Sequence, residues 1–319
     1  MTKMSFPDLL ASSPVILGEG AVIERLRRNP DIVLDPHVVN SALIYQPTGL
    51  NALAKICREY LEIGRQFNMP MMLSTPTWRA SRERIDSAGL TGRDLNGDNA
   101  RFLDGLRREY GDYGQKVVIC GLMSCRGDAY NPAEAMTTDA AREFHRWQAD
   151  ALASSGVDFL LAATLPALSE ATGLAQALAA TGQPYMISVL VRPGGTLLDG
   201  TPLATAIAAI DAATSPRPLA YLVNCTHASV FRKAMLHESN ALSLVRERII
   251  GLLANTSALS PEELDNSTEL AEEEPALFGQ TVAALYQDFG MKLLGGCCGT
   301  DDRHIRCLAE RLSGLGCIN

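Results

Sequence analysis

The sequence contains no long apolar run and no excess of positive charge. No stretch approaches the roughly 20 uninterrupted apolar residues of a membrane-spanning helix, and Met1 to Asp8 lack the basic start and apolar run of a secretory signal. We therefore expect a cytoplasmic chain with no membrane partner. A net charge of -8 and a pI near 5.2 also argue against general binding of nucleic acid, which requires basic patches. A small molecule is the expected partner.

The sequence also lacks the setting of a disulfide framework. Its eight cysteines form an even number, but a chain of 319 residues without an export signal is not where such frameworks normally occur. Metal binding or core packing is the better expectation. Taken singly, five cysteines are expected to be small buried hydrophobic residues: Cys57, Cys120, Cys125, Cys307 and Cys317.

No HExxH motif or other close pair of histidines is present, so none of the five histidines is compelled to be a metal ligand. We expect His227 to be a loop residue or a support for a neighbouring ligand, and His304 to be a surface or packing residue. The absence of a GxGxxG motif after an early strand weakens the case for an open, doubly wound sheet. There is also no internal repeat and no linker that would separate two domains.

What the sequence does contain is eight short apolar runs, separated by segments with helical spacing such as Thr138 to Ser155 and Ile305 to Leu315. Runs that are apolar throughout suit strands buried on both faces. Eight alternations of strand and helix predict a single α/β domain over residues 1–319, folded as a closed parallel (β/α)₈ TIM barrel. The runs are Val15–Gly20, Met69–Pro76, Lys116–Cys125, Val157–Thr164, Pro184–Val191, Ala220–His227, Ile249–Ser257 and Met291–Cys298.

Two insertions follow the first two runs, Ala21 to Pro47 and Trp78 to Asn99. Both come directly after predicted strand ends, where barrel enzymes build their sites. A third irregular stretch, Pro261 to Glu274, is acidic, and we expect it to be a solvated loop.

The strongest local signal is the segment Gly295 to Thr300, with the sequence GGCCGT, which ends the eighth run directly before a predicted helix. Neighbouring residues of an ideal strand point to opposite faces, so Cys297 and Cys298 can bind one ion only if the backbone turns. The flanking glycines permit such a turn. The sequence therefore predicts two thiols at one strand end.

A third thiol, Cys225, lies at the end of the sixth run, and in a closed barrel only one strand separates the sixth from the eighth. Three thiolates can hold zinc and leave one tetrahedral position for a substrate. Three sulfur donors also soften the metal, so activation of a substrate thiol is favoured over hydrolysis by a metal-bound water. A free thiol has a pKa of roughly 8.5, and zinc can keep it deprotonated at neutral pH.

These motifs and the strand rhythm resemble the homocysteine S-methyltransferase family over nearly all of the chain. The resemblance implies that Cys225, Cys297 and Cys298 hold Zn²⁺ in a (β/α)₈ barrel. It implies a zinc-dependent methyltransferase that moves a methyl group from an onium donor, such as S-methylmethionine or betaine, to the thiol of homocysteine or a related compound. It also implies a role in methionine biosynthesis.

Two positions depart from the family pattern. The family usually ends its first strand in Asp-Gly-Gly, whereas this chain has Gly18-Glu19-Gly20, and its fourth strand usually ends in Glu-Thr, whereas this chain has Ala163-Thr164. The carboxylates that would hold the amino group of homocysteine are therefore missing. Either Glu19 takes over from the adjacent position, or it is a solvent-facing residue and the acceptor is a thiol without that amino group.

By the same resemblance, Thr164, Asn224 and Asn255 are candidates for substrate binding, although the two asparagines could instead satisfy loop backbone. Trp78 and Tyr130 could offer aromatic faces to an onium donor, or could simply pack in their loops.

Three alternatives stay open at the level of sequence. The chain could be a related transferase with another thiol acceptor or methyl donor, a binder of a small sulfur metabolite without turnover, or a barrel without zinc. The sequence does not decide the identity of the donor or the oligomeric state.

Overall fold

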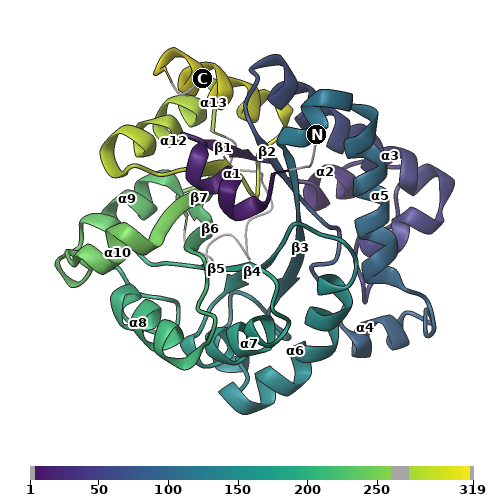
Figure 1. The fold of residues 1–319 in the computed structure, drawn as a ribbon, viewed down its shortest axis with the longest axis horizontal. Coiled ribbons are helices and arrows are strands. Elements are labelled where there is room, and N and C mark those ends of the chain that lie inside the picture. The colour runs from purple at the N-terminus through teal and green to yellow at the C-terminus, as the bar shows by residue number, and fades with distance from the viewer. Residues whose placement is uncertain (1–3, 260–272, 317–319) are drawn as a thin grey trace.

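Eight parallel strands pair in sequence order and close into a barrel (Figure 1). The computed structural model describes residues 4–259 and 273–316. β8 pairs with β1 through Ile16 with Leu293 and Leu17 with Leu294, which closes the ring. The strands are β1 (Ile16–Gly18), β2 (Met71–Ser74), β3 (Val117–Ser124), β4 (Phe159–Leu165), β5 (Tyr185–Val189), β6 (Tyr221–His227), β7 (Ile249–Asn255) and β8 (Leu293–Gly296). The predicted (β/α)₈ barrel is confirmed, and each strand lies within one predicted run, except that β4 ends one residue beyond its run.

Helices surround the barrel (Figure 1). They are α1 (Phe6–Ser12), α2 (Ile23–Arg27), α3 (Pro47–Gln66), α4 (Arg82–Ser87), α5 (Leu95–Glu109), α6 (Thr138–Ala153), α7 (Leu168–Ala180), α8 (Leu203–Ala213), α9 (Ala228–Leu236), α10 (Ser243–Arg248), α12 (Pro275–Phe289) and α13 (Asp302–Gly314). Short 3₁₀ turns occupy Ser41–Tyr45, Gly111–Lys116, Pro132–Glu134 and Glu238–Asn240. The two helices predicted from apolar spacing are α6 and α13.

The strands are apolar on both faces because both faces are covered. Leu17 and Leu73 pack outward in the core between strands and helices, whereas Ile16 and Met72 belong to the core inside the barrel. Such alternation along short strands is the usual arrangement of a filled barrel. The barrel interior is therefore a packed core and not a channel.

The first helix closes the N-terminal end of the barrel. The Phe6 ring of α1 stacks on the Phe159 ring at the start of β4, with centroids 3.8 Å apart and planes 9° from parallel. Lys292, just before β8, donates from Nζ to the Leu10 carbonyl at 3.3 Å. Substrates must therefore approach at the C-terminal strand ends.

The two insertions pack against each other beside β1 and β2. The first contains α2 and the Ser41–Tyr45 turn, and the second contains α4 and the start of α5. Asn99 donates to the Ser41 carbonyl at 3.0 Å, and the Tyr45 hydroxyl donates to Asp98 at 2.6 Å. The insertions thus form an ordered shoulder next to the strand ends.

Among the described residues, no helix is long and apolar enough to cross a membrane. Cys57, Cys120 and Cys125 are buried as predicted, whereas Cys307 on α13 is only partly buried, contrary to expectation. The fifth of these cysteines, Cys317, and residues 261–272 of the expected acidic loop lie outside the described residues.

Candidate metal centre

Three thiols converge at the C-terminal end of the barrel. The Sγ atoms of Cys225, at the end of β6, and of Cys297 and Cys298, just after β8, all lie within 4.8 Å of one another. The Sγ atoms of Cys225 and Cys297 are 2.6 Å apart. No other group of three or more His, Cys, Asp or Glu side chains in the described ranges is arranged to share an ion. The structure therefore brings together the three cysteines that the sequence singled out.

Cys225 reaches this position through an unusual backbone conformation. Its φ is 48°, in the left-handed region, and the β6–β7 register shifts between Asn224 and Thr226. Non-glycine residues adopt this region rarely, and such strain is retained mainly where the surroundings enforce it. A bulge at a strand end re-aims one side chain without disturbing the ladder below.

The surroundings that enforce this conformation centre on Asn224. Its Oδ1 accepts hydrogen bonds from the Thr164 amide at 2.9 Å and the Ser188 hydroxyl at 2.7 Å, and its Nδ2 donates to the Thr164 hydroxyl at 2.7 Å. Thr164 has a positive φ as well, at 61°. These contacts join the ends of β4, β5 and β6. Thr164 and Asn224 are both candidates for substrate binding. In the structure their side chains bind each other, and this contact holds the backbone next to Cys225.

The other two thiols sit on a tight turn whose hydrogen bonds explain the neighbouring residues. The Thr300 amide donates to the Cys297 carbonyl at 3.2 Å, and the Thr300 hydroxyl donates to the same carbonyl at 2.7 Å. That hydroxyl also accepts from the Ala21 amide at 3.0 Å. A Cβ on Gly296 would lie 2.3 Å from the Thr300 hydroxyl oxygen, so only glycine fits there. The predicted turn between the cysteines is present.

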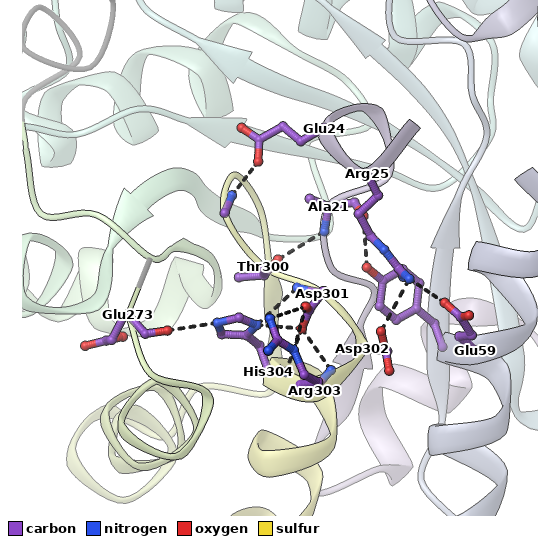
Figure 2. A network of polar contacts seen from close by, with 12 residues as sticks. Ala21, Glu24, Arg25, Glu59, Glu273, Thr300, Asp301, Asp302, Arg303 and His304 are labelled. Atoms are coloured by element: carbon purple, nitrogen blue, oxygen red, sulfur yellow. Dashed lines mark hydrogen bonds and ion pairs between the residues drawn. The ribbon is translucent and has the colours of Figure 1, made fainter. Parts of the chain in front are cut away.

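Glu24 of α2 fixes the far side of the turn, as Figure 2 shows. Its Oε2 accepts the Gly299 amide at 2.6 Å. Gly299 has a φ of +82°, which favours glycine. Burial, reinforced by the nearby Cys298 thiol, raises the pKa of Glu24. Glu24 lies in the first insertion, where no sequence motif singles it out.

The start of α13 anchors the turn to the rest of the barrel. Asp301 accepts from the amides of Arg303 and His304, and His304 Nδ1 faces Asp301 at 2.8 Å in a reciprocal cap (Figure 2). His304 is 1% exposed, and its Nε2 lies 3.0 Å from the Glu273 carbonyl. His304 is thus a packing and capping residue, one of its two expected roles. His227 caps α9 and lies 3.4 Å from the Glu273 carboxylate, so it supports the rim.

Tyr130, after β3, stands beside Cys225. The negative charge of the Cys225 thiolate raises the pKa of the Tyr130 hydroxyl, which therefore stays protonated and donates toward that sulfur. The sequence proposed this ring for an onium donor or for loop packing. The Tyr130 hydroxyl adds a further role, as a hydrogen-bond donor to the Cys225 sulfur.

The loop that carries Tyr130 is held from two sides. Arg79 Nη1 donates to the carbonyls of Cys125, Arg126 and Gly127 at 3.0, 3.0 and 2.7 Å. The buried Glu170 accepts the Arg126 amide at 2.7 Å and the Met136 amide at 3.1 Å.

The guanidinium of Arg79 also lies 4.2 Å from the centroid of the Trp78 ring. One face of Trp78 is therefore already covered by a cation, which leaves less of that ring for an onium donor.

The three thiols share protons among themselves. Hydrogen bonds from the Cys297 and Cys298 thiols hold the pKa of Cys225 well below its ordinary value. Chiefly through the hydrogen bonds to Cys225, the pKa of Cys297 is raised well above the ordinary value and that of Cys298 to about 12. One thiolate stabilised by two thiols is a cluster from which a soft cation can displace protons.

The residues present fit a metal ion held by sulfur. Three thiols that approach within 4.8 Å match a tetrahedral site, in which Zn–S distances of about 2.3 Å place sulfur atoms about 3.8 Å apart. For that geometry, the Sγ atoms of Cys225 and Cys297 would have to move apart by about 1 Å. The cluster could therefore bind a metal with one coordination position left for a ligand.

The position where the family pattern has a carboxylate is closed in this chain. A Cβ on Gly18 would lie 2.7 Å from the Leu253 side chain and 3.2 Å from the Gly295 Cα. Ala163 is 5% exposed and belongs to the core inside the barrel. Glu19 is buried rather than solvent-facing, and its Oε1 accepts the Ser74 amide at 2.8 Å. Burial raises the pKa of Glu19 to about 7.

Asn255, at the end of β7, is 4% exposed, and its Oδ1 accepts no hydrogen bond from the described residues. A substrate donor could satisfy this oxygen. Asn255 therefore differs from Asn224, whose side-chain oxygen is already paired.

A separate surface hollow of about 420 Å³ lies over the insertions and is lined by His37, Glu83, Arg84, Arg126 and Glu134, among others. Several of its charged groups are already paired. Arg126 donates from Nε and Nη2 to the two carboxylate oxygens of Glu83, and Arg84 donates from Nη1 to the His37 carbonyl. None of the residues that line it is a cysteine.

Comparison with known proteins gives concordant results. A model of the homocysteine S-methyltransferase family matches residues 16–312. The chain is 24% identical to betaine–homocysteine S-methyltransferase 1 of Bos taurus over 330 residues, covering 98% of this chain and 75% of the relative. It is 25% identical to S-methylmethionine–homocysteine S-methyltransferase BHMT2 of Pongo abelii, covering 98% and 82%. The metallated homocysteine methyltransferase MmuM of Escherichia coli has the same fold, with a TM-score of 0.74 at 21% identity over 95% of this chain and 98% of that one.

Proposed function

The chain belongs to the homocysteine S-methyltransferase family, and on that basis we propose that it is a zinc-dependent enzyme that transfers a methyl group from an onium donor to a thiol. The observation that carries the proposal is the convergence of the Cys225, Cys297 and Cys298 thiols at the open end of the barrel. We propose these three as the zinc ligands. Zinc bound there would supply Lewis acidity that keeps an acceptor thiol ionised at neutral pH.

In the proposed reaction, the electron pair of the acceptor thiolate forms a bond to the donor's methyl carbon. The bond from that carbon to the donor's positive nitrogen or sulfur breaks, and its electron pair returns to that atom. The products are a methyl thioether and a neutral amine or thioether. The acceptor's proton leaves to solvent when the thiol binds.

The protein's part in this reaction is orientation and exclusion of water. The hydroxyl of Tyr130 donates toward the Cys225 sulfur and limits the charge on it. Asn224 fixes the backbone that presents Cys225, and Glu24 fixes the turn that presents Cys298. Orientation of two reactants in line is worth several orders of magnitude in rate, so these supports matter even without contacting the methyl group. The buried Oδ1 of Asn255 is our candidate for a direct substrate contact.

The names of the relatives suggest the donors to try first, S-methylmethionine and betaine. Purified protein would be loaded with zinc, incubated with each donor and a panel of thiols that includes homocysteine, and assayed for the methyl thioether by mass spectrometry. Metal content would be measured in parallel on the wild type, Cys297→Ser and a control, Cys307→Ser on α13. We expect one zinc per wild-type and control chain, and loss of both zinc and activity in Cys297→Ser.

Each alternative has its own signature in this experiment. Zinc binding without methyl transfer for any donor and acceptor would favour a binding protein. Absence of zinc from the wild type, or unchanged zinc in Cys297→Ser, would overturn the proposed metal site.

A further inference from the structure

The side chains around the thiols narrow the choice of acceptor. We propose that the acceptor is a small aliphatic thiol that carries no charged amino group. This inference rests on the proposed function, because it concerns the thiol that would join the three cysteines at the metal.

The inner wall at the strand ends carries no charge. Side chains alternate along a strand, so a residue two positions after an inward-facing one also faces inward. The core inside the barrel contains Ile16, Met72, Met186, Leu222 and Leu293, and the residues two positions after each of them therefore face inward as well. Together with Leu122, Ala163 and Leu253, which pack on the same core, these residues form the inner wall: Gly18, Ser74, Leu122, Ala163, Ser188, Asn224, Leu253 and Gly295. A thiol bound at the cysteines would extend its carbon chain along this uncharged wall.

The wall is most apolar where β1, β7 and β8 meet. The Leu253 side chain occupies the space next to Gly18, so closely that a Cβ there would lie 2.7 Å from Leu253 Cδ2. Leu253 and Leu122 are both only partly buried, although they pack on the core inside the barrel. Their exposed carbon surface is available to the aliphatic part of a ligand.

The two carboxylates that follow β1 each accept a backbone amide. Glu19 accepts the Ser74 amide through Oε1, and Glu24 accepts the Gly299 amide through Oε2. The second oxygen of Glu19 is buried and has no hydrogen-bond partner among the described residues. Burial raises the pKa of this carboxyl to about 7, so it is only partly ionised at neutral pH.

An ammonium group brought to this wall would therefore lose its water without gaining an anion. Desolvation of an unpaired cation is strongly unfavourable, whereas desolvation of a hydroxyl group in the same place costs far less and that of a methyl group is favourable. This difference in desolvation free energy predicts that the site discriminates between thiols by the charge of this group and not by its size.

The test compares two thiols that differ only in this group, 3-hydroxypropane-1-thiol and 3-aminopropane-1-thiol. Protein loaded with cobalt(II) would be titrated with each, and binding would be followed by the change in the visible spectrum of the metal. We expect the hydroxyl compound to bind about tenfold more tightly. Equal or tighter binding of the amine would overturn this inference while the proposed function stands. A spectrum that responds to neither thiol would overturn the proposed function, and this inference with it.

A pair of variants shows whether the wall is responsible. Ala163→Glu places a carboxylate on the inner wall, and Ala163→Gln adds the same bulk without charge. We expect Ala163→Glu to shift the ratio of the two affinities toward the amine by about tenfold, and Ala163→Gln to leave the ratio as in the wild type. An unchanged ratio in a folded Ala163→Glu variant would contradict the assignment to the wall. If that variant does not fold, the comparison of the two thiols on the wild type still decides the inference.

Discussion

Glu24 and Gly299 are separated by 275 residues in sequence, yet the carboxylate of one accepts the amide of the other at 2.6 Å. The bond links α2, in the insertion after β1, to the turn that carries Cys298 (Figure 2). Groups that orient metal ligands typically contribute 10- to 100-fold to metal affinity.

We expect Glu24→Ala to weaken zinc binding by about 10- to 100-fold, because the turn loses its outer anchor. Glu24→Gln should lose much less, since the amide oxygen can still accept from Gly299. The measurement is competition with a chromophoric chelator. Glu59→Ala is the control, because Glu59 pairs with the adjacent Arg25 but does not contact the turn. Equal zinc affinity in Glu24→Ala and Glu59→Ala would argue against this role.

Thr300 contributes to stability by joining the turn to the first insertion. Thr300→Val keeps the shape but removes the hydroxyl, so the buried Ala21 amide loses its acceptor. We expect a loss of about 1–3 kcal/mol in the free energy of unfolding, measured by urea denaturation. In the control, Thr281→Val, the lost hydroxyl donates only within its own helix, to Leu277 and Phe278. A loss no larger than in this control would show that the Ala21 contact contributes nothing.

Glu19 should give the protein a distinctive dependence on pH. Burial raises its pKa from an ordinary 4.5 to about 7 in the folded state, so between these values the folded chain holds a proton that the unfolded chain releases. The contribution of Glu19 to the free energy of unfolding is therefore fully present below about pH 4.5. It falls by about 3 kcal/mol in all as the pH rises to about 7.

Glu19→Gln cannot titrate and should lack this decline. The check is the free energy of unfolding at several pH values from 5 to 8 for the wild type, Glu19→Gln and Glu143→Gln, whose side chain is exposed on α6. We expect the wild type and the α6 control to lose stability in parallel relative to Glu19→Gln. Curves of the same slope for all three would contradict the raised pKa.

The close approach of the Cys225 and Cys297 sulfurs at 2.6 Å predicts the product of oxidation. Metal-free protein treated with a mild oxidant should form a disulfide between these two cysteines, detected by peptide mapping as a linked pair. Zinc should protect against this reaction because it occupies the thiolates. Cys298→Ser, which leaves the pair intact, should still form the link. Preferential linkage of Cys298 in the wild type would contradict the prediction.

Much of the fold followed from local patterns. Each of the eight apolar runs matches one strand, because a strand buried on both faces must be apolar throughout. The segment Gly295 to Thr300 marked a turn with two thiols, since its glycines let the backbone bend at the strand end and bring adjacent cysteines to one side. Cys225 could be added only by assuming a closed barrel, which places β6 one strand away from β8.

The remaining features depend on contacts between distant segments, and sequence patterns do not report those. Glu24 looks like any surface glutamate at a helix start, and its bond to Gly299 exists only because the barrel closes. Asn224 and Thr164 were predicted to bind substrate, and the hydrogen bond that their side chains form with each other was not visible in the sequence. The sequence left two roles for Glu19, because its burial depends on distant residues such as Ser74, whose amide it accepts.

The thiol cluster draws on both ends of the chain, since its turn is held by Ala21 and Glu24, and its cysteines lie at the end of β6 and just after β8. A ribosome-bound chain that has not yet released its last strand cannot present three thiols to one ion. A metal bound by all three thiols would therefore be acquired after synthesis and barrel closure, and its content should then serve as a marker of chains that have finished folding.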